Sequence, residues 1–212
     1  MENKLFSNTD AQRIEEAIKT AEKKTNGEIV VHVSEQSDAY FSGVLACSLL
    51  LGGASLVLAY GSSFFVPSLA TEYAELFSIV VFILAFALAF FIPSIRLLFV
   101  APDEIDRRVI EKAERVFLER ELFQTKDRTG LLIFISYLEH RVEVLGDTGI
   151  NKQISQEQWV DIVNAITAGI KNKNASDGVV KGISLAADLL VTSDFHIQPD
   201  DENELPNTIS FG

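Results

Sequence analysis

Two long stretches without a charged residue constrain this chain more than any other feature. The first runs from Val44 to Thr71 and the second from Leu76 to Ile95. A helix of about 20 residues spans roughly 30 Å, which is the thickness of the hydrocarbon core of a bilayer. The two stretches therefore predict two membrane-spanning helices.

The alternative is a pair of helices buried in the core of a water-soluble protein. A chain of 212 residues cannot wrap two long helices that are apolar on all sides, so we favour membrane spans. The segment between them, Pro67 to Glu75, is short enough to force an antiparallel hairpin. The first ten residues are polar, so we expect no signal peptide.

The charges lie outside these spans. Thirty acidic side chains against 18 basic ones give a net charge of -12. We find no cluster of Lys and Arg that could follow a phosphate backbone, so nucleic acid is not an expected partner. Basic residues do follow the second span, which under the positive-inside rule predicts a multi-pass protein of the plasma (inner) membrane with its soluble part in the cytoplasm. They are Arg96, Arg107, Arg108, Lys112 and Arg115.

Hydrophobic periodicity predicts alternating helices and strands in the polar parts. Helices are expected to begin near Thr9 or Asp10, at Asp103, after Ser155 and at Ser176 or Asp177, where acids and hydroxyls precede an apolar stripe. Strands are expected at Glu28–Val33, Leu131–Ile135 and Arg141–Leu145, with a short edge strand at Ile209–Phe211.

The strand at Glu28–Val33 precedes the hairpin, whereas the strand at Leu131–Ile135 follows it. Neither has enough partners nearby to bury its apolar face, so we expect the two strands to share one sheet. An even number of spans allows this, because the chain returns to the side that it left. The helix from Asp103 to Phe123 then forms the crossover of a β-α-β unit.

Four segments of this chain resemble the TPM domain family, in its membrane-anchored bacterial branch. They are Thr25–Val33, Thr125–Ile133, Gly146–Ile150 and Asp200–Pro206. The resemblance implies an α/β fold, an α/β/α sandwich, here with an inserted two-helix transmembrane hairpin. It also implies one of several activities, since the family includes proposed acid phosphatases, binders of divalent cations and assembly or repair factors.

These inferences divide the chain into four parts. Residues 1–43 form the first part of a TPM-like domain, 44–100 the transmembrane hairpin, 101–193 the remainder of the domain and 194–212 an acidic C-terminal tail.

Carboxylates supply the candidate site. Asp147 lies on a loop at the end of a predicted strand, where ligands commonly bind in α/β sheets. If the tail folds back, Asp147 together with Asp200, Asp201 and Glu202 offers oxygen ligands for Ca²⁺ or Mg²⁺. The alternative is a solvated acidic tail. We expect no organic cofactor.

Other chemistry finds less support. Asp147-Thr148-Gly149 matches the aspartic-protease tripeptide, but that mechanism needs two such loops and the chain has one. His32, His140 and His196 lack the paired spacing of a zinc site. The single cysteine, Cys47, excludes a disulfide within the chain.

The sequence thus predicts a membrane-tethered binding or assembly domain that engages a divalent cation or a membrane protein partner. The alternative is a metal-dependent phosphomonoesterase in which Asp147 and the tail carboxylates bind the ion and a water attacks phosphorus. Whether the chain is an enzyme stays open. A channel is disfavoured, because two spans without internal charge offer no polar pathway.

Overall fold

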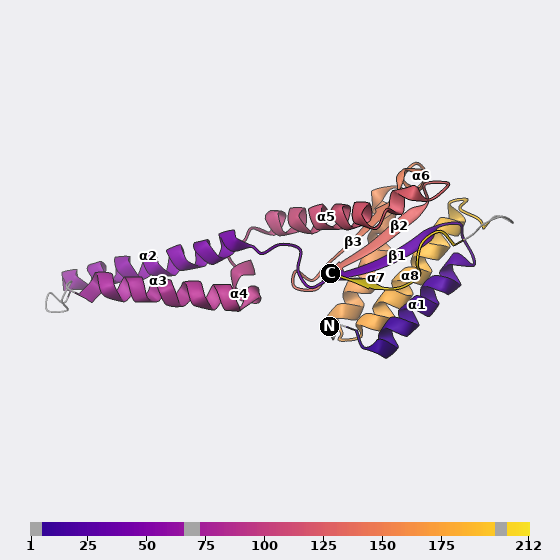
Figure 1. Cartoon of the computed structure of the whole chain (residues 1–212). Helices are drawn as coiled ribbons and strands as arrows, with labels where there is room; N and C mark the ends of the chain where they lie inside the picture. The colour runs from indigo at the N-terminus through magenta and orange to yellow at the C-terminus, as the bar shows by residue number, and fades with distance from the viewer. Residues whose placement is uncertain (1–5, 66–72, 198–202) are drawn as a thin grey trace. The chain divides into compact units, whose positions relative to one another are not determined.

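The computed structural model describes residues 6–65, 73–197 and 203–212. The chain forms two compact units, one made of Met1–Ser37 with Arg108–Gly212 and the other of Asp38–Arg107. The first unit contains one four-stranded sheet in the order β3-β2-β1-β4, which is labelled in Figure 1.

The two inner strands come from opposite sides of the hairpin in the sequence. Strand β1 (Glu28–Ser34) and strand β2 (Gly130–Ser136) are parallel and pair along their whole length. The prediction that the early and late strands share a sheet is therefore confirmed. Strand β3 (Arg141–Gly146) runs antiparallel to β2, and β4 (Ser210–Phe211) pairs with β1 at His32 and Val33.

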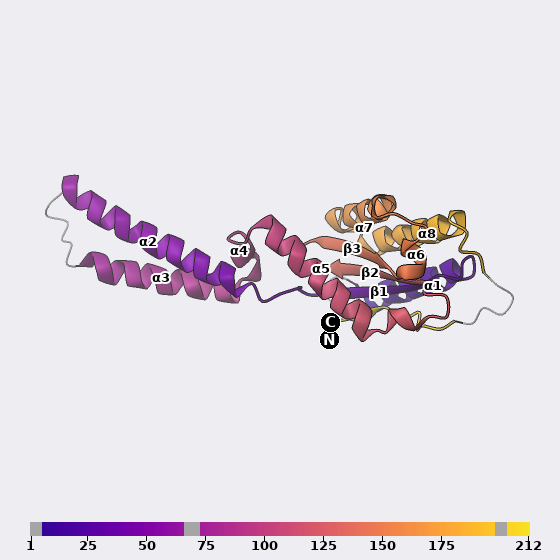
Figure 2. The ribbon, with the colours of Figure 1, turned by 90° about the horizontal axis from the view of Figure 1, so that it is seen from above.

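Helices cover both faces of this sheet (Figure 2). Helices α1 (Asn8–Glu22), α7 (Val160–Lys171) and α8 (Ala175–Thr192) lie on one face, and α5 (Pro102–Glu119) lies on the other. All seven residues of β2 are buried, as expected for a central strand covered on both sides. The unit is thus a mixed α/β sandwich.

Short helical turns complete the unit: η2 (Leu122–Gln124), α6 (Thr148–Asn151) and η3 (Gln156–Trp159). Helix α5 ends before the predicted Phe123, because Glu121 adopts a left-handed φ of 55° that no continuing helix allows. Helix α8 begins earlier than predicted, with Asn174 at its N-cap; the carboxylate of Asp177 accepts a hydrogen bond from the Asn174 amide instead of capping the helix.

The described part of the C-terminal tail, residues 203–212, is held against the sheet. The carboxylate of Glu28 accepts hydrogen bonds from the backbone N–H groups of Glu204 and Leu205, both at 3.2 Å. The Asn207 amide donates to Glu22. The predicted edge strand at the end of the chain is confirmed as β4.

The second unit is a pair of long helices, α2 (Phe41–Phe65) and α3 (Ala74–Phe91), followed by the short α4 (Pro93–Leu97). The two long helices pack through small and apolar side chains, namely Val44, Cys47, Ala85 and Ala89. Both are long and apolar enough to cross a membrane, over Phe41–Ser62 and Ala74–Phe91, and only 28% and 22% of these windows are buried.

Candidate functional site

Asp147 lies where strand β3 ends, and it caps the short helix α6. Its Oδ1 accepts the Thr148 N–H at 2.6 Å and a hydrogen bond from Arg128 Nη2 at 3.0 Å. Its Oδ2 accepts the Arg128 Nε–H at 2.6 Å. Asp147 is only 3% exposed, and both of its carboxylate oxygens accept from Arg128 in a bidentate ion pair whose arginine side chain is half exposed.

The charge of Asp147 is stabilised by these contacts. Burial works to raise the pKa of the carboxyl, but the hydrogen bonds from Arg128 and Thr148 outweigh it and hold the pKa below its usual value. The following Gly149 is required by packing, since a Cβ there would lie 2.5 Å from the carbonyl oxygens of Arg128 and Asp127. The Asp-Thr-Gly tripeptide is therefore a tightly packed turn in which Asp147 has a structural role.

The position of Asp147 also differs from the expectation. Because β3 is antiparallel, its end lies beside the start of β2, and the Asp147 N–H donates to the Gly130 carbonyl at 2.8 Å. Ligands in α/β sheets bind at the carboxyl ends of the parallel strands, which is the opposite edge. The other predicted metal ligands, Asp200, Asp201 and Glu202, lie outside the described residues.

Within residues 6–65, 73–197 and 203–212, no group of three or more His, Cys, Asp or Glu is placed to hold a metal ion. The three histidines lie on separate parts of the fold: His32 in β1, His140 in the turn before β3 and His196 after α8. Among the described residues, the structure brings Asp147 to Arg128.

The carboxyl ends of β1 and β2 carry a polar cluster that sequence analysis missed. Ser136 donates its hydroxyl hydrogen bond to Glu139 Oε2, and the Ser37 N–H donates to Glu139 Oε1 at 2.7 Å. The hydroxyls of Ser37 and Ser136 are 2.7 Å apart. Ser136 is fully buried and Glu139 is 5% exposed, and their hydrogen bonds to Ser37 tie the segment after β1 to the end of β2.

His32 is a second buried polar group. Its ring stacks on Phe134 at 5.7 Å between centroids, and its Nδ1 lies 2.8 Å from the Ser210 hydroxyl in β4. Burial, and then the positive charges of Arg120 and Lys112, lower its pKa from 6.5 to about 4. The ring is therefore neutral at physiological pH, and its Nδ1 links β1 to Ser210 of β4.

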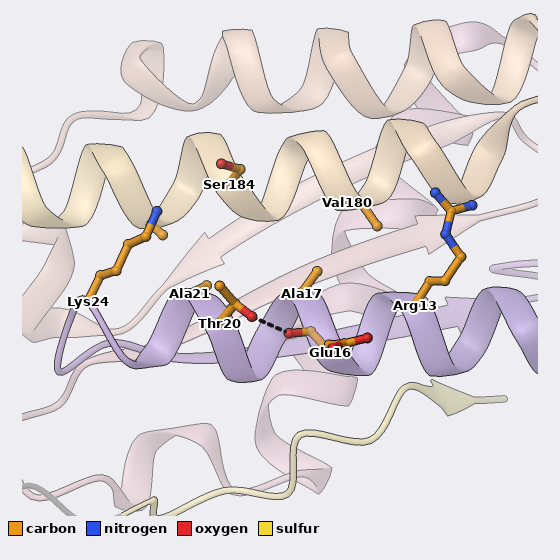
Figure 3. A pocket seen from close by; sticks show the side chains of 9 residues that line it. Arg13, Glu16, Ala17, Thr20, Ala21, Lys24, Val180 and Ser184 are labelled. Carbon is orange, nitrogen blue, oxygen red and sulfur yellow. Dashed lines mark hydrogen bonds between the residues drawn. The ribbon is translucent and has the colours of Figure 1, made fainter.

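One open feature of this unit is a groove between α1 and α8, a cavity of about 370 Å³ that Figure 3 shows from close by. Its floor consists of small side chains, and Arg13 and Lys24 stand at opposite ends of it. The lining residues are Arg13, Glu16, Ala17, Thr20, Ala21, Lys24, Val180, Ser184 and Ala187.

Ion pairs join α1 and α8 at both ends of the groove. Arg13 pairs with Asp177 at 2.5 Å and Lys24 with Asp188 at 3.8 Å, both across the two helices. These side chains are about half exposed, so rearranging such pairs costs little. The apolar stripes predicted for the two helices do not indicate that the small side chains of Ala17, Ala21 and Ala187 leave a hollow between them.

Comparisons with known proteins complete these observations. Residues 94–189 match the family model described as the TPM domain. The solved structure of the BA42 protein from the psychrophilic bacterium Bizionia argentinensis is similar to this chain, with a TM-score of 0.62 and 25% sequence identity. The similarity covers 100% of this chain and 98% of that protein. The curated proteins contain no match to this sequence.

Proposed function

This chain contains a TPM domain, as its sequence predicted, and we propose that it is a membrane-tethered binding module. In this proposal the α2–α3 hairpin enters a bilayer and holds the TPM domain at its surface, where the domain engages a protein partner.

The exposure of the hairpin carries the proposal. Helices α2 and α3 bury less than a third of their apolar windows within the protein, whereas the core helix of a water-soluble protein is mostly buried. Large apolar side chains project from both helices, including Leu50, Leu58, Leu84 and Phe91, each at least 60% exposed. A continuous apolar surface of this kind is unfavourable in water and favourable in lipid.

The sheet constrains the topology of such an insertion. Because β1 and β2 are hydrogen-bonded neighbours on either side of the hairpin, both ends of the hairpin must lie on the same side of the membrane. The basic residues after α3, among them Arg107 and Arg108, favour the cytoplasmic face of the plasma membrane.

Binding is favoured over catalysis by the state of the reactive groups. Asp147, Glu139 and His32 are each at most 5% exposed and hold the fold together through hydrogen bonds. The α1–α8 groove is open, and we assign the contact with a protein partner to it. The phosphomonoesterase alternative gains no support from the described residues.

Binding of Ca²⁺ or Mg²⁺ is a separate part of the proposal, supported by the sequence of the tail. Asp147 would have to exchange its bond to Arg128 for the ion, so we expect Asp200, Asp201 and Glu202 to dominate. Calorimetric titration of the full chain with Ca²⁺ tests this. Heat that persists unchanged when the three tail residues become amides would contradict it.

Membrane insertion is tested with the double variant Leu50→Lys/Leu84→Lys. Both side chains are exposed within the spans, so the variant leaves the packing of the hairpin intact while each lysine disfavours insertion by about 3 kcal/mol. We expect the wild type to stay with membranes after alkaline extraction and the variant to be released. Val160→Lys, at a half-exposed apolar position of α7, is the matched control and should stay bound. Release of the wild type as a soluble monomer would refute the proposal.

A topology measurement completes this test. Single cysteines placed at Tyr73 and at Asn174, in a Cys47→Ser background, report the side of each position in intact cells. We expect an impermeant thiol reagent to label position 73 and not position 174, since one lies between the two spans and the other in the domain. Labelling of position 174 from outside would overturn the cytoplasmic assignment.

A further inference from the structure

The hairpin itself carries a second groove, between α2 and α3. It is a cavity of about 500 Å³ with mostly apolar walls. The lining residues are Leu49, Gly52, Gly53, Leu56, Tyr60, Glu75, Ser78, Ile79 and Phe82. The groove lies within a single compact unit, so both of its walls keep their places relative to each other.

Two neighbouring glycines have different roles in this groove. A Cβ on Gly52 would lie 3.0 Å from the Phe82 Cβ, so this glycine brings the two helices together. A Cβ on Gly53 would meet no atom within 4 Å, although Gly53 also lines the groove. The space beside Gly53 is therefore open, and the absence of a side chain there leaves room for a ligand.

One end of the groove is polar and acidic. The Tyr60 hydroxyl donates a hydrogen bond to Glu75 Oε1 at 3.0 Å, and among the described residues that line the groove Glu75 alone is charged. It lies in the first turn of α3, at the end of the predicted span. From Val44 to Ile95 the sequence has two charged residues, Glu72 and Glu75, and no base. A ligand with a positive charge at one end complements this arrangement.

The length of the groove defines the ligand further. On α2 the lining residues extend from Leu49 to Tyr60, which corresponds to roughly 16 Å of helix. This is about half of the hydrocarbon core of a bilayer, or one leaflet. A neighbouring transmembrane helix would follow the hairpin across both leaflets, whereas an acyl chain anchored at one surface ends at this depth.

We propose that the α2–α3 groove binds one acyl chain of a phospholipid with a primary ammonium headgroup, with the ammonium beside Glu75. The inference rests on the proposed insertion of the hairpin into a bilayer. The carboxylate accepts a charge-assisted hydrogen bond from the ammonium, and the acyl chain runs past Leu56 and Gly53 toward Leu49. A phospholipid with acyl chains of the same length but an anionic headgroup lacks the ammonium, and Glu75 repels its charge.

Native mass spectrometry of the full chain in detergent tests this inference, with phosphatidylethanolamine and phosphatidylglycerol of identical acyl chains as probes. We expect the wild type to retain one phosphatidylethanolamine about two- to fivefold more often than phosphatidylglycerol, the effect of one ion pair at an exposed site. Equal retention of the two lipids would overturn the role of the ammonium.

Three variants separate the two parts of the site. Glu75→Gln should retain both lipids equally, since it removes the charge and leaves the walls. Gly53→Leu should retain neither, because a Cβ there meets no atom within 4 Å and the side chain takes up the open space. Gly61→Leu is the matched control: a Cβ there also meets no atom within 4 Å, but Gly61 does not line the groove, so binding should equal that of the wild type.

The outcomes also separate this inference from the proposed function. A chain that stays in membranes after alkaline extraction but retains neither lipid refutes the lipid site alone. A wild type released by extraction refutes the insertion on which the site depends. A dimer that Gly53→Leu abolishes would assign the groove to a second copy of the chain and overturn the lipid proposal.

Discussion

Strand β2 and helix α3 are the two most apolar segments of their units, yet they are covered in opposite ways. All seven residues of β2 are buried, between β1 and β3 and beneath helices on both faces. In α3 the buried residues are four small ones, Ala74, Ser78, Ala85 and Ala89, while the large side chains project outward. The chain covers its own sheet on both faces but leaves the large apolar side chains of its hairpin exposed. Hydropathy alone therefore does not report the environment of a segment.

The largest expected effect tests this contrast between β2 and α3 directly. Ile133→Lys places a charge at a fully buried position of β2, and we expect a loss of at least about 4 kcal/mol in the free energy of unfolding of the domain. Leu84→Lys, at a position that is 63% exposed in α3, should leave that free energy unchanged. Trp159, the single tryptophan, is buried in the core of the domain, so its fluorescence during denaturant unfolding reports on this unit. Equal losses of unfolding free energy in the two variants would show that the difference in burial between β2 and α3 does not affect the stability of the domain.

A smaller effect is expected from the polar group on the covered sheet. The pKa of His32 is lowered to about 4 in the folded protein, against 6.5 in the unfolded chain. The unfolded chain therefore takes up the proton first, so stability is complete above pH 6.5 and falls as the pH is lowered toward 4. Between pH 7.5 and pH 5 we expect a loss of about 2 kcal/mol from this residue.

Unfolding measured at both pH values checks the His32 prediction. His32→Phe should remove this part of the pH dependence, since a neutral ring can still stack on Phe134. His196→Gln is the control and should retain it, because the side chain of His196 is largely exposed. The same pH dependence in His32→Phe and in the wild type would show that another group carries it.

The smallest effect concerns the ion pair at the edge of the sheet. Asp147→Asn keeps a helix-capping side chain but loses the charge that Arg128 stabilises, and we expect a loss of about 1 kcal/mol at pH 7. Because the pKa of Asp147 is lowered in the folded protein, its contribution is present above the ordinary carboxyl pKa and is lost as the pH falls through the lowered value. The difference between wild type and variant should therefore shrink in acid. A difference that grows in acid would refute the assigned sign.

The fold was predictable where one physical constraint left a single solution. Two apolar stretches of bilayer length fixed the hairpin, and the shortage of partners for Glu28–Val33 required pairing with Leu131–Ile135. The capping box at Ser155 also formed as predicted. Helix ends were less predictable, because the left-handed conformation of Glu121 depends on the packing of η2 and is not encoded by that residue type.

The site was less predictable, because its contacts depend on strand direction. Arg128 and Asp147 are 19 positions apart, and they meet only because β3 turns back antiparallel to β2. Once that register is known, an ion pair between Arg128, before β2, and Asp147, after β3, can be predicted. The Glu139 cluster needs the same information and also the path of the chain after β1, which the sequence does not define.

The pairing of β1 with β2 across the hairpin has a consequence for biosynthesis. Strand β1 leaves the ribosome before any other strand. Its parallel partner β2 is complete only when residue 136 has been translated, after both helices of the hairpin. If the hairpin inserts as proposed, failure of either helix to insert would leave β1 and β2 on opposite sides of the membrane. Completion of the domain would then act as a quality-control step for integration, and a misinserted chain would expose an unfinished sheet to the proteases of the cell.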